Sequence, residues 1–470
     1  MAGSGSGFPR NTQPYLRCAQ DKMEEACGVF GIYAPGRDLP RIATYALYAL
    51  QHRGQESAGI AISDGKSIYL KKGAGLVSEV FSNNKDLEEI PAVSALGHVR
   101  YSTAGSSCLE NAQPLLIRYR QGALAVAHNG NLINGSELRD RLEKEGSIFQ
   151  TTTDSELVTH LIARYGYHDL ESSLKAVLPE LQGAYSFVFL TEDSLVGVRD
   201  PLGMRPLSLG KWNNSYVLAS ETCAFDTIGA ETIRDIKPGE MVIINREGIR
   251  STQALPSPRF ALCIFEFIYF ARPDSNIQGK NIHLIRKELG RQLAREQPAD
   301  ADIVTGVPDS SLAAASGYAE EMGLPYEMGL IKNRYIGRTF IQPKQEIRSL
   351  GVQLKLNPVK KLVEGKRVVI VDDSIVRGTT SKKLVDMLFK AGAKEVHLRI
   401  SSSPVISPCY YGIDISTREE LIAYKRKIEE IRREVGATTL GYLSRQGMLD
   451  SLGMSEESLC LACFSGKYPI

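Results

Sequence analysis

The segment RVVIVDDSIVRGTTS (367–381) constrains the fold more than any other part of the sequence. An apolar strand pattern ends in Asp372 and Asp373, and a loop rich in Gly, Ser and Thr then opens a helical pattern. In open α/β sheets, ligands bind beyond the carboxyl ends of strands, and a helix N-terminus offers backbone N–H groups to a phosphate. Neither a Walker loop nor a dinucleotide fingerprint occurs here. The segment predicts an α/β domain with a phosphate site at a strand end.

The pattern of apolar and polar residues along the 470-residue chain changes near residue 255. Before it, Gly, Asn and Ser separate short apolar runs such as AYSFVFL (184–190), which predicts sheets with interspersed helices. After it, apolar strands alternate with helical patterns, as in a parallel sheet. We therefore expect a leader at 1–26, one domain at 27–255 and a second at 256–470.

Composition excludes several classes of protein. The 56 Lys and Arg nearly balance the 54 Asp and Glu, so we expect no broad nucleic-acid surface. No run approaches the ~20 apolar residues of a membrane span, and residues 1–26 lack the apolar stretch of a secretory signal. We expect no membrane association and a cytoplasmic location, or an organelle lumen if the leader is a targeting peptide.

Apolar residues recur at helical spacing from Thr417 to Val435. Thr417 and Glu420 have the spacing of a capping box, and Gly436 is a suitable stop. The pattern predicts one amphipathic helix over 417–435, whose basic residues form a solvated face.

Cys27 lies in ACGVFGIY, a small residue, a cysteine and a short apolar strand. Cleavage after Ala26 would give a terminal cysteine whose α-amino group, with a pKa of ~7.7–8.0, can accept the thiol proton. From this segment alone, a buried cysteine at a strand start is the simpler interpretation.

Five motifs in order change that interpretation, because together they resemble the class II glutamine amidotransferase domain. They are CGVFG (27–31), LQHRGQESAGI (50–60), GHVRYST (97–103), AHNGNL (127–132) and TTTDSE (151–156). The resemblance implies an α+β αββα sandwich similar to the N-terminal nucleophile hydrolases. It also implies that Cys27 attacks the glutamine amide and releases ammonia through a thioester.

The same resemblance implies roles for four further residues. Asn129 and Gly130 would supply the two donors that stabilise the oxyanion of the acyl transfer. Arg100 would bind the α-carboxylate of glutamine, and Asp154 its α-ammonium group. Without the resemblance, an Asn-Gly turn and two surface charges would explain these residues.

His98 and His128 lie beside these motifs. We do not expect either to be the general base, because the terminal amine already fills that role and histidines within apolar strands are usually structural.

The second half resembles the type I phosphoribosyltransferases, which bind phosphoribosylpyrophosphate (PRPP). Asp372 and Asp373 match the two acids that hold the ribose hydroxyls. The residues matching the 5′-phosphate cradle are Ser374, Arg377, Gly378, Thr379 and Thr380. In TGVPDSS (305–311), Ser310 matches the position that joins the two acids around Mg²⁺. Two acids that cap a helix would explain one carboxylate only.

Between these strand ends, KNRYIGRTFIQP (332–343) places Lys332, Arg334 and Arg338 around a glycine. It predicts a mobile basic flap that stabilises departing pyrophosphate and excludes water when closed.

Over its whole length the chain resembles the glutamine PRPP amidotransferases, one branch of which carries a [4Fe–4S] cluster. Its four ligands match Cys263, Cys409, Cys460 and Cys463. From spacing alone, a Cys₄ zinc site or core cysteines fit as well. Cys18, Cys108 and Cys223 match no motif.

The resemblance implies that ammonia passes internally from glutamine to PRPP, giving 5-phosphoribosylamine, pyrophosphate and glutamate in purine synthesis. It also implies purine nucleotides as feedback inhibitors and a homotetramer. Two alternatives stay open: a different class II amidotransferase, or a PRPP- or nucleotide-binding regulator with a redox-sensing cluster and no turnover.

Overall fold

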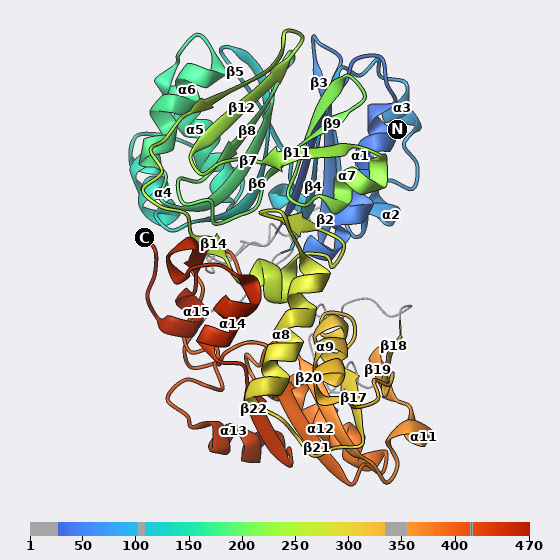
Figure 1. The fold of residues 1–470 in the computed structure, drawn as a ribbon. Helices are drawn as coiled ribbons and strands as arrows, with labels where there is room; N and C mark the ends of the chain where they lie inside the picture. Colours follow the sequence, from blue (N-terminus) through green and yellow to red (C-terminus); the bar gives the residue numbers. More distant parts are fainter. Residues whose placement is uncertain (1–26, 102–108, 334–354, 414, 416) are drawn as a thin grey trace, which may run out of the picture.

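A computed structural model describes residues 27–101, 109–333, 355–413, 415 and 417–470. It has two lobes, with the first half of the chain forming one and most of the second half forming the other (Figure 1). None of the helices in these described ranges combines the length and apolar character needed to span a bilayer.

The first lobe contains two antiparallel sheets. The order in the seven-stranded sheet is β11 (Glu231–Asp235), β9 (Ser208–Trp212), β10 (Ser215–Ala219), β1 (Gly28–Tyr33), β4 (Ser94–Arg100), β2 (Ser57–Ser63) and β3 (Ile68–Ala74). The order in the six-stranded sheet is β13 (Gly248–Gln253), β12 (Glu240–Asn245), β8 (Ser194–Arg199), β7 (Gly183–Leu190), β6 (Gly122–Leu132) and β5 (Leu115–Tyr119).

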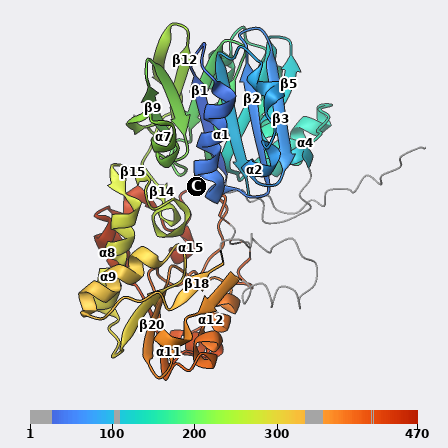
Figure 2. The ribbon, with the colours of Figure 1, turned by 90° about the vertical axis from the view of Figure 1, so that its right-hand side faces the viewer.

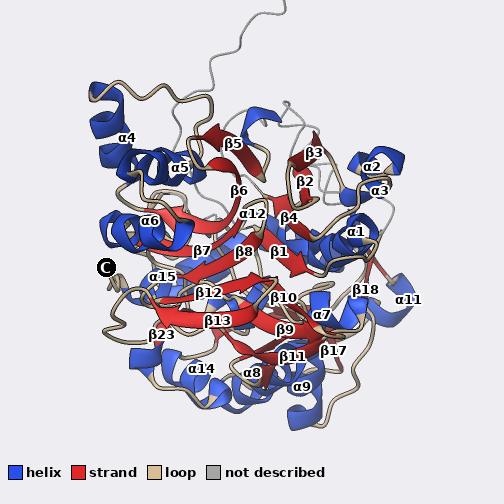
Figure 3. Cartoon of the chain, turned by 90° about the horizontal axis from the view of Figure 1, so that it is seen from above, coloured by secondary structure: helices blue, strands red, loops and turns tan. Residues whose placement is uncertain are grey.

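Helices cover the outer faces of both sheets, as the view from above shows (Figure 3). On the seven-stranded sheet lie α1 (Leu39–Leu50), α2 (Val77–Val80), α3 (Lys85–Glu88) and α7 (Cys223–Ile228). On the six-stranded sheet lie α4 (Gly135–Lys144), α5 (Asp154–Tyr165) and α6 (Leu170–Val177). The expected αββα sandwich is therefore confirmed.

Alternation along β1 explains how this sandwich forms. Phe30 and Ile32 point to the helices, while Val29 belongs to the apolar layer between the sheets. Gly31 also faces that layer, where a Cβ would come within 3.0 Å of Leu195 and 3.1 Å of Val188. A strand of period two thus buries both faces, and a glycine allows the sheets to approach.

The second lobe is built on the predicted parallel sheet. Its strands are β17 (Ile303–Gly306), β20 (Arg367–Asp372), β21 (Glu395–Ile400) and β22 (Thr439–Tyr442). One face packs against α8 (Ile282–Glu296) and α9 (Leu312–Met322). The other packs against α12 (Thr379–Lys390) and α13 (Ile428–Val435), so the α/β expectation is also confirmed.

Shorter elements complete the described chain. The strands are β14 (Leu262–Cys263), β15 (Asn276–Ile277), β16 (Lys280–Asn281), β18 (Leu330–Lys332), β19 (Leu356–Pro358) and β23 (Leu459–Cys460). The helices are α11 (Lys360–Val363), α14 (Arg445–Leu452), α15 (Ala462–Ser465) and the π-helical turn η4 (Glu266–Phe270), with the 3₁₀ turns Gln51–Arg53, Leu109–Asn111, Leu178–Glu180 and Glu456–Ser458.

The prediction of one helix over 417–435 was wrong. Helix α13 begins only at Ile428, although Gly436 does end it with a φ of +77°. Before it, the backbone N–H of Ile422 donates to the carbonyl of Val376 at 2.9 Å, and Glu420 pairs with Arg377. Tertiary contacts with the loop after β20 therefore override the local helical pattern.

Candidate functional site

Cys27 lies directly before β1 and is fully buried. Its backbone N–H donates to Oδ1 of Asn129 at 3.4 Å, and its carbonyl accepts a 2.9 Å hydrogen bond from Nε of Arg53. Asn129 comes from β6 in the other sheet of the sandwich. The fold therefore brings together two predicted site residues that are 102 positions apart.

Gly130 follows Asn129 in β6 with a φ of +145°. A Cβ at this position would lie 2.0 Å from the carbonyl oxygen of Ala184 on the neighbouring strand β7. Only glycine fits this backbone, because the obstructing atom is itself backbone and cannot turn away.

Arg100 and Asp154 are both buried. Arg100 Nη1 lies 3.9 Å from Oε1 of Glu56. Asp154 accepts hydrogen bonds from Nδ1 of His128 and from the backbone N–H of Leu132, each at 2.9 Å. Burial acts to raise the pKa of Asp154, but the His128 ring and these hydrogen bonds outweigh it and lower the pKa below its usual value.

No pattern in the sequence indicates that His128 is the partner of Asp154. His98 is also fully buried, and its Nε2 contacts the carbonyl oxygen of His128 at 3.0 Å. Burial lowers the pKa of His98 to about 3, so this ring is uncharged at neutral pH. Both rings thus have structural partners close to the proposed glutamine site.

Asp372 and Asp373 lie at the carboxyl end of β20, facing the loop that follows β17. From that loop, Ser310 Oγ donates to Asp373 at 2.5 Å and Ser311 Oγ to Asp372 at 3.1 Å. Ser374 Oγ also donates to Asp373, at 2.6 Å. The two strand ends predicted to form one site therefore do meet, and Ser311 is an additional member that its place beside Ser310 could have indicated.

Burial dominates the pKa of both acids, although the charge of Arg286 acts to lower the pKa of Asp373. Burial and then the charge of Asp373 raise the pKa of Asp372 well above its usual range, and burial raises the pKa of Asp373. Buried carboxylates in this state suit a hard divalent cation, and Mg²⁺ is commonly held by one or two carboxylates together with substrate phosphates. The residues present therefore fit Mg²⁺.

Gly378 caps α12 with a φ of +78°, and a Cβ there would lie 2.3 Å from Cδ1 of Ile422. Thr379 and Thr380 form the exposed first turn of α12. Arg377 is exposed as well, but its guanidinium pairs with Glu420 at 2.7 Å. These residues thus lie together at the start of α12, with Arg377 paired to a carboxylate, and their role as a phosphate cradle stays a prediction.

Lys332 ends β18, where its Nζ lies 2.5 Å from Oδ2 of Asp309. Arg334 and Arg338, the other two cations of the predicted flap, lie outside the described residues, as do the leader, Cys18 and Cys108.

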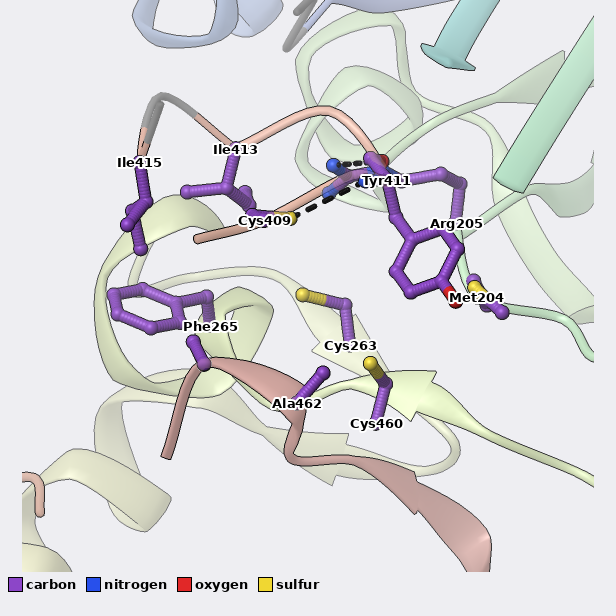
Figure 4. Close-up of a pocket in the computed structure, with 11 residues that line it drawn as sticks. Met204, Arg205, Cys263, Phe265, Cys409, Tyr411, Ile413, Ile415, Cys460 and Ala462 are labelled. Atoms are coloured by element: carbon purple, nitrogen blue, oxygen red, sulfur yellow. Dashed lines mark hydrogen bonds between the residues drawn. The ribbon is translucent and has the colours of Figure 1, made fainter. Parts of the chain in front are cut away.

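Cys263, Cys409, Cys460 and Cys463 all line one pocket. The parallel pairing of β14 with β23 sets Cys263 beside Cys460, and β14 lies at the junction of the lobes (Figures 1 and 2). Figure 4 shows Cys409 across the pocket from Cys263 and Cys460. Burial raises the pKa of Cys263 to about 12. The charge of Arg205 acts to lower this pKa, and that of Cys409 acts to raise it.

Comparison with known proteins decides the family. One family profile, described as a glutamine amidotransferase domain, matches residues 98–227, and another, described as a phosphoribosyl transferase domain, matches 277–402. The amidophosphoribosyltransferase of Bacillus subtilis is 54% identical over 452 residues, which cover 95% of this chain and 94% of that protein. The chain belongs to the amidophosphoribosyltransferase family.

Other amidophosphoribosyltransferases are similarly close. The protein of Archaeoglobus fulgidus is 51% identical, over 94% of this chain and 98% of that protein. A chloroplastic one from Glycine max is 50% identical, over 98% of this chain and 81% of that protein. A solved structure of the B. subtilis enzyme complexed with ADP and GMP has a TM-score of 0.89 at 54% identity, covering 94% of this chain and 97% of that one.

Membership in the amidophosphoribosyltransferases makes this chain a transferase with a glutamine amidotransferase domain and a PRPP-using domain. The glutamine-dependent enzyme interpretation is confirmed, and the relatives give no support to a regulator without turnover.

The Gly130 backbone provides a first prediction for this amidophosphoribosyltransferase. Gly130→Ala must push β6 away from β7, so we expect loss of glutamine hydrolysis and a fall of ~1–3 kcal/mol in the free energy of unfolding. Gly135→Ala is the matched control, because its Cβ would meet nothing closer than 3.5 Å. Glutamate release and thermal unfolding measure both effects; a Gly130→Ala enzyme as active as the control would contradict the prediction.

Proposed function

We propose that residues 1–26 are removed and that Cys27 then hydrolyses glutamine, within a glutaminase domain at 27–255. Ammonia passes internally to PRPP bound at Asp372 and Asp373, within a transferase domain at 256–470. The products are glutamate, 5-phosphoribosylamine and pyrophosphate. The observation that carries this proposal is that one chain has two candidate sites, one at Cys27, Asn129 and Gly130 and one at the end of β20.

In the glutaminase step, the freed α-amino group of Cys27 takes the thiol proton as the sulfur attacks the amide carbon. Asn129 Nδ2 and the backbone N–H of Gly130 stabilise the oxyanion. Losing one such donor typically costs ~2.7–4 kcal/mol of barrier. When the oxyanion collapses, the C–N bond breaks and the α-ammonium group of Cys27 gives its proton to the leaving nitrogen, which departs as ammonia. Water then hydrolyses the thioester to glutamate. Arg100 and Asp154 hold the two ends of glutamine, and the ionised state of Asp154 is supported by its lowered pKa.

In the transfer step, Asp372 and Asp373 hold the ribose hydroxyls while the loop 374–380 holds the 5′-phosphate. Mg²⁺, bound with Ser310 and the two acids, would supply positive charge to the pyrophosphate. Lys332, Arg334 and Arg338 add cations when the flap closes, which also excludes the water that competes with ammonia.

Relatives support proposals on regulation and location. The B. subtilis enzyme is complexed with ADP and GMP, which supports purine nucleotides as feedback inhibitors of this chain. We also propose a homotetramer and a cytoplasmic location, or an organelle lumen if the leader is a targeting peptide, since the G. max relative is chloroplastic.

We further propose that the four pocket cysteines bind a [4Fe–4S] cluster with a structural or oxygen-sensing role. Four cysteines that line one pocket provide the four thiolates that such a cluster requires.

Removing one cluster ligand tests this. Cys460→Ser should lose the visible absorbance and the bound iron, about four atoms per chain. Cys223→Ser is the matched control, because Cys223 is equally buried but lies in the first lobe. Zinc in the purified protein, or full iron in Cys460→Ser, would contradict the cluster assignment.

The whole function is tested by pyrophosphate release from PRPP and Mg²⁺, with either glutamine or ammonium as the nitrogen donor. We expect release with both. No release with either would refute the proposal, and release with ammonium alone would show that the leader is still attached.

A further inference from the structure

Four charged side chains are buried together where the two lobes meet. Arg53, Arg205 and Glu221 come from the first lobe. Glu266 is the first residue of the turn η4, which follows that lobe in the chain. Each is at most 1% exposed. Two positive and two negative charges balance, which such burial requires.

Arg53 is the centre of this cluster. Its Nη1 and Nη2 donate to Oε2 and Oε1 of Glu266 at 3.0 and 2.9 Å, and Nη1 also donates to Glu221. The third nitrogen, Nε, donates to the carbonyl oxygen of Cys27 at 2.9 Å. A two-pronged arginine–carboxylate contact fixes the plane of the guanidinium, so Glu266 determines where Nε points.

Glu266 is itself held by the second lobe. Arg286 of α8 donates to the carbonyl oxygens of Phe267 and Ala271 at 2.8 Å each, which fixes η4 against the helix that packs on the parallel sheet. Arg205, from the first lobe, also contacts the Glu266 carboxylate at 3.3 Å. The main chain of η4 is therefore held by the transferase lobe, while the guanidinium that Glu266 binds belongs to the glutaminase lobe.

We infer that Glu266 is a positioning residue for glutamine hydrolysis: through Arg53 it fixes the main chain of Cys27, so that the transferase lobe sets the position of the nucleophile. This inference rests on the proposed role of Cys27. Because the reacting sulfur is only a few bonds from the held carbonyl, a shift of ~1 Å in Arg53 would cost about 100-fold in rate.

The test is the rate of Cys27 alkylation by a diazoketone analogue of glutamine in the full-length, processed enzyme. Glu266→Gln keeps the size of the side chain but places an NH₂ group against an Arg53 donor. We expect the alkylation rate constant and kcat with glutamine to fall about 100-fold. KM for glutamine and ammonium-dependent turnover should change little, because Arg100, Asp154 and the PRPP site are untouched.

Glu240→Gln is the matched control, because Glu240 forms a similar two-pronged pair with Arg234 but has no hydrogen bond to Arg53 or Cys27. A merely structural role for Glu266 would reduce the fraction of active enzyme, and with it both nitrogen sources equally, while leaving the alkylation rate constant of the active fraction unchanged. That result, or a wild-type rate constant for Cys27 alkylation in Glu266→Gln, would overturn the inference.

If Glu266→Gln fails to fold, Arg205→Met combined with Glu266→Gln restores the charge balance of the cluster without restoring the hold on Arg53. This double variant should still be alkylated slowly, and fast alkylation would overturn the inference. The proposed function fails separately: in that case the wild-type enzyme is labelled at a residue other than Cys27.

Discussion

Cys27→Ala is expected to abolish glutamine-dependent formation of phosphoribosylamine while leaving ammonium-dependent formation close to wild type. Removing the nucleophile from an acyl-transfer enzyme costs on the order of 10⁶-fold in kcat. The transferase site keeps all its residues, because Asp372 and Asp373 lie in the other lobe. Pyrophosphate release with each nitrogen source measures both activities.

The control for this variant is Cys223→Ser. Cys223 is a buried cysteine of the same lobe, and burial followed by the charge of Glu221 raises the pKa of its thiol, which keeps it uncharged and unreactive. We expect both activities to survive in the control. Glutamine-dependent turnover in Cys27→Ala would show that another residue is the nucleophile.

Asp372→Asn should reduce transfer with both nitrogen sources, while glutamine hydrolysis at Cys27 remains possible. Loss of a carboxylate that holds ribose and Mg²⁺ should reduce transfer on the order of 100-fold to 1000-fold. Asp386→Asn is the control, because Asp386 is exposed on α12. An Asp372→Asn enzyme that retains transfer would contradict the assignment.

The same substitution should stabilise the ligand-free protein. Burial and Asp373 raise the pKa of Asp372, so the folded state binds more protons than the unfolded state and stability falls as pH rises above the usual carboxyl value of ~3.9. Asp372→Asn removes this charge and should raise the free energy of unfolding at pH 7 by ~1 kcal/mol. A lower unfolding temperature than wild type at neutral pH would contradict this expectation.

Local patterns were sufficient to predict the parallel sheet and its site. The apolar strand before Asp372 and the loop before Thr379 are short-range features, and burial on both faces of the sheet follows from them. The helix expected from Thr417 was wrong because Ile422 and Glu420 contact the loop carrying Val376 and Arg377, which no local pattern reports.

Contacts between residues far apart in the chain could not be predicted from the local sequence pattern. Cys263 and Cys460 are brought together by the pairing of β14 with β23, and only the family resemblance indicated that they share a site. The contact of His128 with Asp154 and that of Arg53 with Glu266 join separate elements, so their partners could not be read from spacing.

In the proposed reaction, nitrogen travels inside the protein from Cys27 to the PRPP site. Internal transfer is tested most directly by supplying PRPP, glutamine with a heavy-isotope amide nitrogen, and an excess of unlabelled ammonium at a pH where both donors are used. We expect glutamine-derived product to carry the heavy nitrogen in full proportion to the glutamate formed, as measured by mass spectrometry. Heavy nitrogen diluted to the isotopic composition of the surrounding ammonium would contradict internal transfer.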